Sequence, residues 1–133
     1  MFKRLLPIAA GLASVPALAF PSLSWAAPSE ANFLASCGAC HQPSGMGIPG
    51  AFPALAGNAF VQGPAQPVIS TVLGGRGGMP AFKGDLDDAN LASVLSYVRT
   101  AWGNKASLVE PAELAAVRTG AAGPADKAIG APH

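Results

Sequence analysis

The segment Cys37-Gly-Ala-Cys40-His41 carries the chemistry that is most evident in the sequence. Two cysteines three positions apart, with a histidine directly after the second, form the C-x-x-C-H pattern of covalent c-type haem attachment. The two thiols can form thioethers to the vinyl groups of one haem, and the adjacent imidazole can serve as an axial ligand of the iron. The chain contains no other cysteine, so both thiols would serve this one site.

Other functions of a cysteine pair explain the segment less completely. A zinc site needs about four ligands, whereas the chain has two cysteines and two histidines, one of which is the terminal His133. A thioredoxin-like dithiol would accompany a βαβ pattern, which the sequence does not show. A structural disulfide in an oxidising compartment stays open as an alternative, but it would leave His41 without a role.

Met79 is the candidate for the second axial ligand. Its thioether is a soft, neutral donor that favours ferrous iron. Glycines crowd the residues just before it, so the backbone could pass close to a porphyrin face, and Pro80 restricts the chain just after the sulfur. A lone methionine is more often core filler, but filler would lie on a helix face. Met46 follows His41 too closely to reach the opposite face of the ring.

The proximal histidine also needs a partner for its other ring nitrogen. A ligating imidazole usually donates that N–H to a carbonyl or carboxylate, which orients the ring and raises its basicity. The proline-rich loop after His41 can present such a carbonyl. We predict that Pro53 provides it, with Pro49 as the next candidate; stiffening of the loop is the alternative role of these prolines.

The N-terminal segment predicts export. Met1 to Arg4 form a short basic region, an apolar run extends from Leu5 to Ala19, and two small-residue cleavage sites follow, at Ala17-Leu-Ala19 and Ser24-Trp-Ala26. We favour the second site, which makes residues 1–26 a signal peptide. An uncleaved membrane anchor is the rival interpretation, but the run falls short of the roughly 20 apolar residues of a spanning helix.

The elements expected around the motif are short helices. A gap between them, residues 42–63, is too rich in Gly and Pro for a long helix or strand and predicts an ordered loop. No strand-like alternation is visible, so the predicted fold is all-α. Capping residues and apolar spacing predict helices over residues 29–39, 67–73, 87–102 and 107–118, the last with Ser107 and Glu110 as a capping box.

Size and charge narrow the function further. About 107 residues remain after signal removal, which is one domain in which a buried haem would supply much of the core. Without Lys3 and Arg4, six basic residues face seven acidic ones. This near-neutral balance argues against nucleic acid, which requires a basic face. A monomer or a subunit of a complex is expected.

With these residues in view, the chain resembles the class I cytochromes c over residues 31–102. The resemblance is carried by the C-x-x-C-H segment, by Phe33 ahead of it, by Met79-Pro80 and by a final helix containing Val94 and Tyr97. It implies a small all-α fold wrapped around one haem c, bound through Cys37 and Cys40 and ligated by His41 and Met79. It also implies that Phe33 packs against Val94 and Tyr97.

The expected domain layout follows from this resemblance. Residues 27–104 form the cytochrome c domain, residues 105–118 a helical extension and residues 119–133 a disordered tail. The segments His41–Asn58, Gly78–Phe82 and Ser96–Asn104 are also similar to haem modules of cytochrome subunits that serve periplasmic dehydrogenases, and to modules fused to copper nitrite reductases.

The resemblance implies a periplasmic one-electron carrier that is not itself an enzyme. It would take electrons from a dehydrogenase and pass them to an oxidase or another cytochrome, and it would have no membrane span after signal cleavage. The alternative is a haem sensor or a peroxide-reactive haem protein with a labile sixth ligand, in which Arg76 would lie near the open site.

Overall fold

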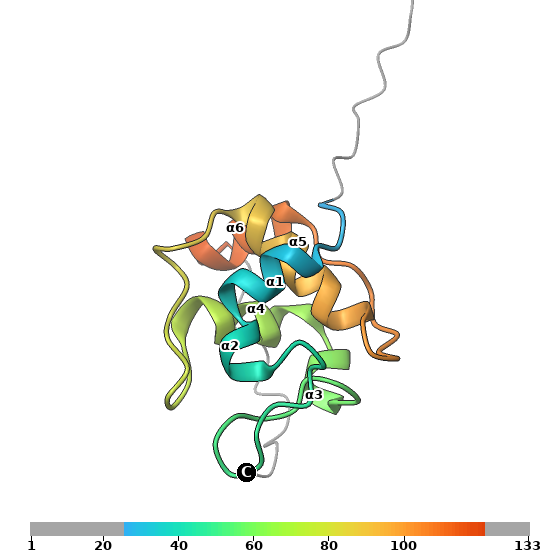
Figure 1. Cartoon of the computed structure of the whole chain (residues 1–133). Coiled ribbons are helices and arrows are strands. Elements are labelled where there is room, and N and C mark those ends of the chain that lie inside the picture. The colour runs from blue at the N-terminus through green and yellow to red at the C-terminus, as the bar shows by residue number, and fades with distance from the viewer. Residues whose placement is uncertain (1–25, 122–133) are drawn as a thin grey trace, which may run out of the picture.

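The computed structural model describes residues 26–121 (Figure 1). The predicted signal peptide, apart from Ala26, and the predicted tail beyond residue 121 lie outside the described residues. Within these bounds the chain has no β-strand, only the isolated bridges Ile48–Phe52 and Arg76–Met79, which confirms the all-α prediction. The helices are α1 (Glu30–Ser36), α2 (Gly38–His41), α3 (Ala59–Gln62), α4 (Ala65–Gly74), α5 (Asp88–Thr100) and α6 (Pro111–Thr119).

Side-chain caps explain where several helices begin. The Ser29 hydroxyl accepts a hydrogen bond from the Asn32 N–H at 3.2 Å at the start of α1. The Asp87 carboxylate accepts one from the Asn90 N–H at 2.7 Å at the start of α5. Each cap satisfies a backbone donor that has no partner within its helix.

The last helix differs from its predicted form. The capping box of α6 is made by Glu110 and Glu113, not by Ser107 and Glu110. Ser107 instead accepts two hydrogen bonds from Arg99, at its carbonyl (2.9 Å) and its hydroxyl (3.1 Å). Thr119, which the sequence placed in the tail, is the last residue of α6.

Helix α5 is the centre of the molecule, because its two sides belong to two apolar clusters. The first cluster joins α5 to α4 and α6, and the second joins it to α1 and α3. The first contains Val68, Ile69, Val72, Leu73, Leu91, Ala92, Leu95, Val109 and Leu114, and the second contains Phe33, Val61, Val94 and Val98. Burial of these side chains is the main favourable term that holds the helices together.

Helix α6 is part of this core. Leu114 is completely buried and Val109, just before the helix, is 1% exposed. The Ser96 hydroxyl on α5 accepts a hydrogen bond from the Val109 N–H at 2.9 Å. The segment that the sequence suggested as an extension therefore packs against α4 and α5 as an integral element (Figure 1).

Candidate haem-attachment site

The C-x-x-C-H segment lies at the junction of α1 and α2. Cys37 ends α1, where its N–H donates to the Phe33 carbonyl at 2.8 Å, and it also caps the start of α2. Cys40 and His41 lie on the single turn of α2. Both cysteines are unpaired and half-buried. The thiols are therefore free for thioether formation, and the structure has no disulfide between them.

The environment of Cys37 does not suit a redox dithiol. Burial raises the pKa of this thiol to about 11, and the neighbouring Cys40 acts in the same direction. Reactive cysteines in C-x-x-C oxidoreductases have a lowered pKa, because the thiolate is the nucleophile. Among the described residues there is also no group of three or more His, Cys, Asp or Glu side chains that could hold a metal ion.

His41 is oriented by the carbonyl that the sequence predicted. The imidazole is 9% exposed, and its Nδ1 lies 3.0 Å from the Pro53 carbonyl oxygen. Since a carbonyl only accepts, Nδ1 carries the proton in this contact, and Nε2 keeps its lone pair. That tautomer is the one that an axial histidine requires.

Gly47 allows the Pro53 carbonyl to come this close. Its φ angle is +62°, and a Cβ built on it would lie 2.3 Å from the Phe52 carbonyl oxygen and 2.6 Å from that of Pro53. Two backbone hydrogen bonds of 2.8 Å between Ile48 and Phe52 close the turn that follows. The sequence pattern indicated only that this glycine breaks helices, but the lack of a side chain at this position is what the contact between Pro53 and His41 needs.

Asn104 holds the far end of the loop that carries Pro53, a role that no sequence pattern indicated. Its side chain is 4% exposed. Its amide NH₂ donates to the carbonyls of Leu55 (3.0 Å) and Val98 (2.8 Å), and its Oδ1 accepts from the Gly57 N–H at 2.9 Å. One buried amide thus connects the loop that carries Pro53 to the end of α5.

Trp102 is a second residue whose role was missed. Helix α5 ends at Thr100 and not at Trp102 as predicted, and Trp102 then takes a positive φ of 52°. Its indole N–H donates to the Pro43 carbonyl at 3.1 Å, and its ring covers Gly45, where a Cβ would lie 2.5 Å from the indole. The side chain therefore packs directly on the loop that follows the attachment motif.

An aromatic cluster connects α1 to α5. Phe33 is fully buried and belongs to the same apolar cluster as Val94, and its ring centroid lies 5.4 Å from that of Tyr97, which confirms the predicted contact. Trp102 is the unpredicted third member, with its centroid 5.1 Å from Phe33 and 5.3 Å from Tyr97. Such tilted and edge-on pairs add to the stabilisation from burial.

Arg99 donates hydrogen bonds to the segment that joins α3 to α4. Its side chain is 2% exposed, and one terminal nitrogen donates to the carbonyls of Val61 (2.7 Å) and Gly63 (2.9 Å). Burial lowers the pKa of this guanidinium, and the carboxylate of Glu113 partly offsets that effect. The group stays charged at neutral pH, since arginine does not deprotonate in proteins.

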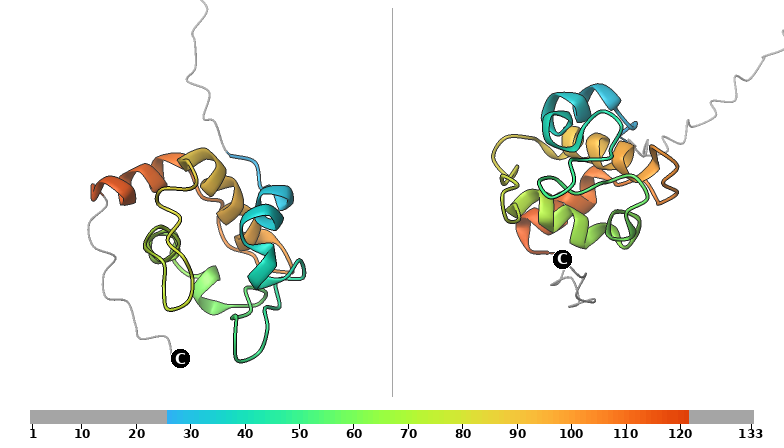
Figure 2. Two further views of the ribbon diagram at one scale, coloured as in Figure 1. Left: turned by 60° about the vertical axis from the view of Figure 1, so that its left-hand side comes forward. Right: turned by 60° about the horizontal axis from the view of Figure 1, so that its bottom comes forward.

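Met79 lies in a tight turn after α4. It pairs with Arg76 through backbone hydrogen bonds of 2.9 and 3.2 Å, and its half-buried side chain packs against the first apolar cluster. Gly75, with a φ of +75°, lies under this turn, where a Cβ would be 2.7 Å from the Met79 carbonyl oxygen. In the left view of Figure 2, this segment (yellow) lies to the left of α2 (teal) and apart from it.

The donor set fits a covalently attached haem. Two free thiols stand at the attachment spacing, and a buried imidazole has one nitrogen hydrogen-bonded and the other with a lone pair. The thioether of Met79 lies in a separate turn that is flanked by glycines. Of the exposed large apolar residues, Leu34 precedes the motif in α1, and Met46, Ile48 and Phe52 lie in the loop after it, which suits contact with an apolar ring.

Comparison with known proteins agrees with this site. A family model described as cytochrome C oxidase, cbb3-type, subunit III, matches residues 26–98, which is more than half of the chain and includes Cys37, Cys40, His41 and Met79. None of the helices within residues 26–121 has the length and apolarity needed to cross a bilayer.

Several curated proteins are similar to part of the chain. Cytochrome c-552 of Thermus thermophilus is 36% identical in an alignment of 97 positions, which covers 62% of this chain and 66% of that protein. Cytochrome c6 of Leptolyngbya boryana is 41% identical in an alignment of 69 positions, which covers 50% of this chain and 80% of that protein.

A third relative is a subunit of a larger enzyme. The cytochrome c subunit of alcohol dehydrogenase (quinone) from Gluconobacter oxydans is 31% identical in an alignment of 100 positions, which covers 65% of this chain and 21% of that subunit. The chain thus spans just under two thirds of the cytochrome c-552 and about a fifth of the dehydrogenase subunit.

Proposed function

The chain belongs to the cytochrome c family, and we propose that it carries single electrons from a dehydrogenase to a downstream acceptor, with His41 and Met79 as the axial ligands of its haem. Members of this family are electron-transfer proteins rather than enzymes, and they hold haem c covalently. Cys37 and Cys40 are the two residues available for that attachment. When bound, haem c supplies one iron that accepts and releases one electron.

The observation that carries the proposal is the hydrogen bond between His41 Nδ1 and the Pro53 carbonyl. It holds the ring in one tautomer and one orientation, which leaves the lone pair of Nε2 available to coordinate iron. A histidine that only filled the core would not need a loop closed around a glycine to present a carbonyl to it. The contact also raises the basicity of the ring, which strengthens it as a ligand.

The assignment of Met79 is supported by its surroundings. The residue lies in a turn of a glycine-rich segment, where its backbone pairs with Arg76. Its side chain packs against the first apolar cluster. Met46, the other methionine within the described residues, is 61% exposed and lies in the loop that follows His41. Met79 is therefore the better candidate for the face opposite His41.

Electron transfer would be fast because the residues around the iron change little in protonation or position when the iron gains or loses an electron. Histidine and methionine are neutral donors, and neither gains nor loses a proton when the charge of the site changes by one. The loops that carry them are tied by short backbone and side-chain hydrogen bonds. Apolar surroundings also favour the less charged, reduced state and so raise the reduction potential.

The similarity to a dehydrogenase cytochrome subunit supports a dehydrogenase as the electron donor. An oxidase or another cytochrome is the proposed acceptor. The basic and apolar N-terminal segment supports export to the periplasm. With a nearly neutral exported chain, docking to either partner should depend only weakly on salt.

The test uses two methionine variants of the periplasmically expressed holoprotein. Met79→Ala should keep the covalent haem, lose the far-red sulfur-to-iron band of the oxidised spectrum, lower the reduction potential and bind carbon monoxide when reduced. Met46→Ala is the matched control and should match the parent in all four. If Met79→Ala keeps the band and excludes carbon monoxide, Met79 is not the ligand. A parent protein that itself binds carbon monoxide readily would support the sensor or peroxide-reactive alternative.

A further inference from the structure

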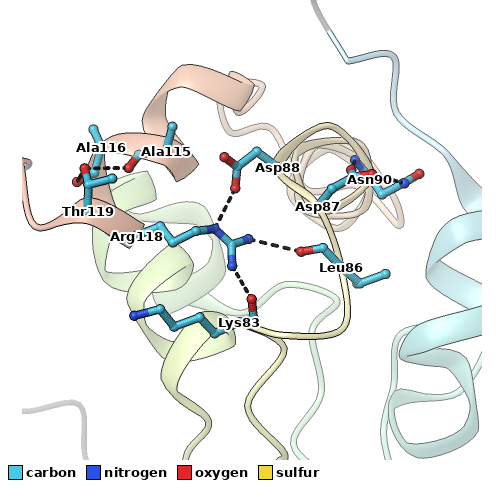
Figure 3. A network of polar contacts seen from close by, with 9 residues as sticks. All are labelled: Lys83, Leu86, Asp87, Asp88, Asn90, Ala115, Ala116, Arg118 and Thr119. Carbon is cyan, nitrogen blue, oxygen red and sulfur yellow. Dashed lines mark hydrogen bonds and ion pairs between the residues drawn. The ribbon is translucent and has the colours of Figure 1, made fainter.

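Arg118, near the end of α6, connects the last helix of the core to the segment that follows Met79. Its Nε lies 2.9 Å from the Asp88 carboxylate, in the first turn of α5. One terminal nitrogen donates to the Leu86 carbonyl at 3.1 Å, and the other donates to the Lys83 carbonyl. Figure 3 shows the guanidinium in the middle of these three acceptors, so that one side chain joins α6, α5 and the loop between Met79 and α5.

The loop held by Arg118 has few backbone hydrogen bonds to the core. Beyond the Arg76–Met79 pair, its backbone is attached to the core by one hydrogen bond, from the Phe82 N–H to the Val72 carbonyl at 3.0 Å. The N–H groups of Asp85 and Leu86 donate back to Phe82 and close a turn within the loop itself. The side chains of Phe82 and Leu86 also pack against the first apolar cluster, and the Arg118 guanidinium adds the hydrogen bonds that hold the backbone at the far end of the loop.

Helix α6 is a rigid support for this contact. Leu114, one helical turn before Arg118, is completely buried, and the Glu110–Glu113 capping box fixes the start of the helix. The side chains of Arg118 and Asp88 are only 21% and 30% exposed, so the ion pair is partly shielded from water and salt. The planar guanidinium can donate to several acceptors at once, which an ammonium on a flexible stem does less well.

We propose that α6 acts through Arg118 as a brace that keeps the Met79 loop closed, which makes Arg118 a positioning residue for the sixth ligand. The inference rests on the proposed function, since it takes Met79 as that ligand. With haem bound, movement of this loop would carry the Met79 thioether away and open the site to external ligands. Arg118 opposes this motion because the loop cannot shift without losing two charge-assisted hydrogen bonds. The residue lies beyond the segment matched by the family model.

The experiment compares imidazole binding by the oxidised, full-length holoproteins. Because hydrogen bonds from a charged donor are among the stronger ones, Arg118→Ala should bind imidazole about tenfold more tightly than the parent. It should also lose its far-red band at a lower temperature, with the haem still attached. Arg118→Lys keeps a cation for Asp88 but not the planar fork, and it should show a smaller change in the same direction. It also serves as the readout if Arg118→Ala does not fold.

Glu113→Ala is the matched control. It removes a capping contact, the hydrogen bond from the Glu110 N–H to the Glu113 carboxylate at 2.8 Å, at the other end of the same helix. It weakens α6 without touching the loop, so its imidazole affinity should equal that of the parent. An equal rise in Arg118→Ala and Glu113→Ala would show that helix stability, not the brace, controls access, and would overturn the proposal.

Met79→Ala separates the assignment of Met79 as the ligand from the proposed role of Arg118 as the brace. If it binds imidazole far more tightly than the parent while Arg118→Ala does not differ from the parent, Met79 is the ligand and the brace is refuted. If Met79→Ala leaves the affinity unchanged, the ligand assignment fails and the brace fails with it. Tighter binding in Met79→Ala and in Arg118→Ala, with Glu113→Ala unchanged, supports both.

Discussion

Replacing Gly47 with alanine tests whether the loop around His41 is built as the structure shows. The change adds one methyl group at a position with a φ of +62°. That methyl carbon would lie 2.3 and 2.6 Å from the carbonyl oxygens of Phe52 and Pro53, so the backbone must move. We expect the Pro53 carbonyl to be displaced from His41 and the Ile48–Phe52 pair to be weakened.

Gly50 provides the matched control for the size of this effect. Its φ is +78°, and a Cβ there would meet nothing within 4 Å. Gly50→Ala should therefore cost only the left-handed backbone conformation, about 1 kcal/mol. Gly47→Ala adds the loss of about two hydrogen bonds, each worth ~1 kcal/mol, so its free energy of unfolding should fall by about 3 kcal/mol.

Guanidinium chloride titration of the three holoproteins, followed by circular dichroism, gives the free energies of unfolding. The reduction potential provides a second readout, because the bond to Pro53 raises the basicity of the His41 ring and so favours ferric iron. Gly47→Ala should raise the potential, and Gly50→Ala should not. Equal losses of stability in the two variants, with equal potentials, would refute the proposed packing of Gly47 against the Pro53 carbonyl.

Three further predictions use the same titration. Asn104→Ala should lower the free energy of unfolding by about 2–3 kcal/mol, since three buried or part-buried hydrogen bonds are lost. Asn32, whose amide makes only an exposed hydrogen bond to Asn90, is the control, and Asn32→Ala should stay within about 0.5 kcal/mol of the parent. Arg99→Met should cost about 3 kcal/mol because buried carbonyls lose their donor, and a neutral effect would refute this. Phe33→Ala should cost about 3–5 kcal/mol, and a loss below about 1 kcal/mol would contradict its full burial.

Much of the site was predictable because its information is local in the chain. The attachment motif needs two thiols and an imidazole within five consecutive residues, and any helical turn brings them together. Most of the helices were predictable for the same reason, since caps such as Ser29 and Asp87 act on backbone groups three residues away. The short helix α3 (Ala59–Gln62) lies within residues 42–63, which the sequence predicted as a loop. The roles of Met79 and Pro53 at the iron stay predictions, although the contact between Pro53 and His41 is present.

The residues that the sequence analysis missed act over long distances in the chain. Asn104 bonds to Leu55, 49 positions away, and Trp102 bonds to Pro43, 59 positions away. The predicted capping role of Ser107 was wrong because Arg99, from the central helix, takes both of its acceptors. No local pattern could reveal these partners, since they depend on how the helices cross.

The sequence by itself therefore determined the chemistry of this protein: the cysteine pair for covalent haem attachment, the histidine beside it and the all-α framework, each encoded within a few neighbouring residues. Only the tertiary structure decided how that chemistry is held in place. Glycine at position 47 leaves room for the Pro53 carbonyl beside it. The amide of Asn104 and the guanidinium of Arg118 donate to backbone carbonyls that they meet only after the core has packed. The physical reason is that hydrogen bonds and steric contacts extend only a few ångströms, so they form between distant residues only when the fold brings them together.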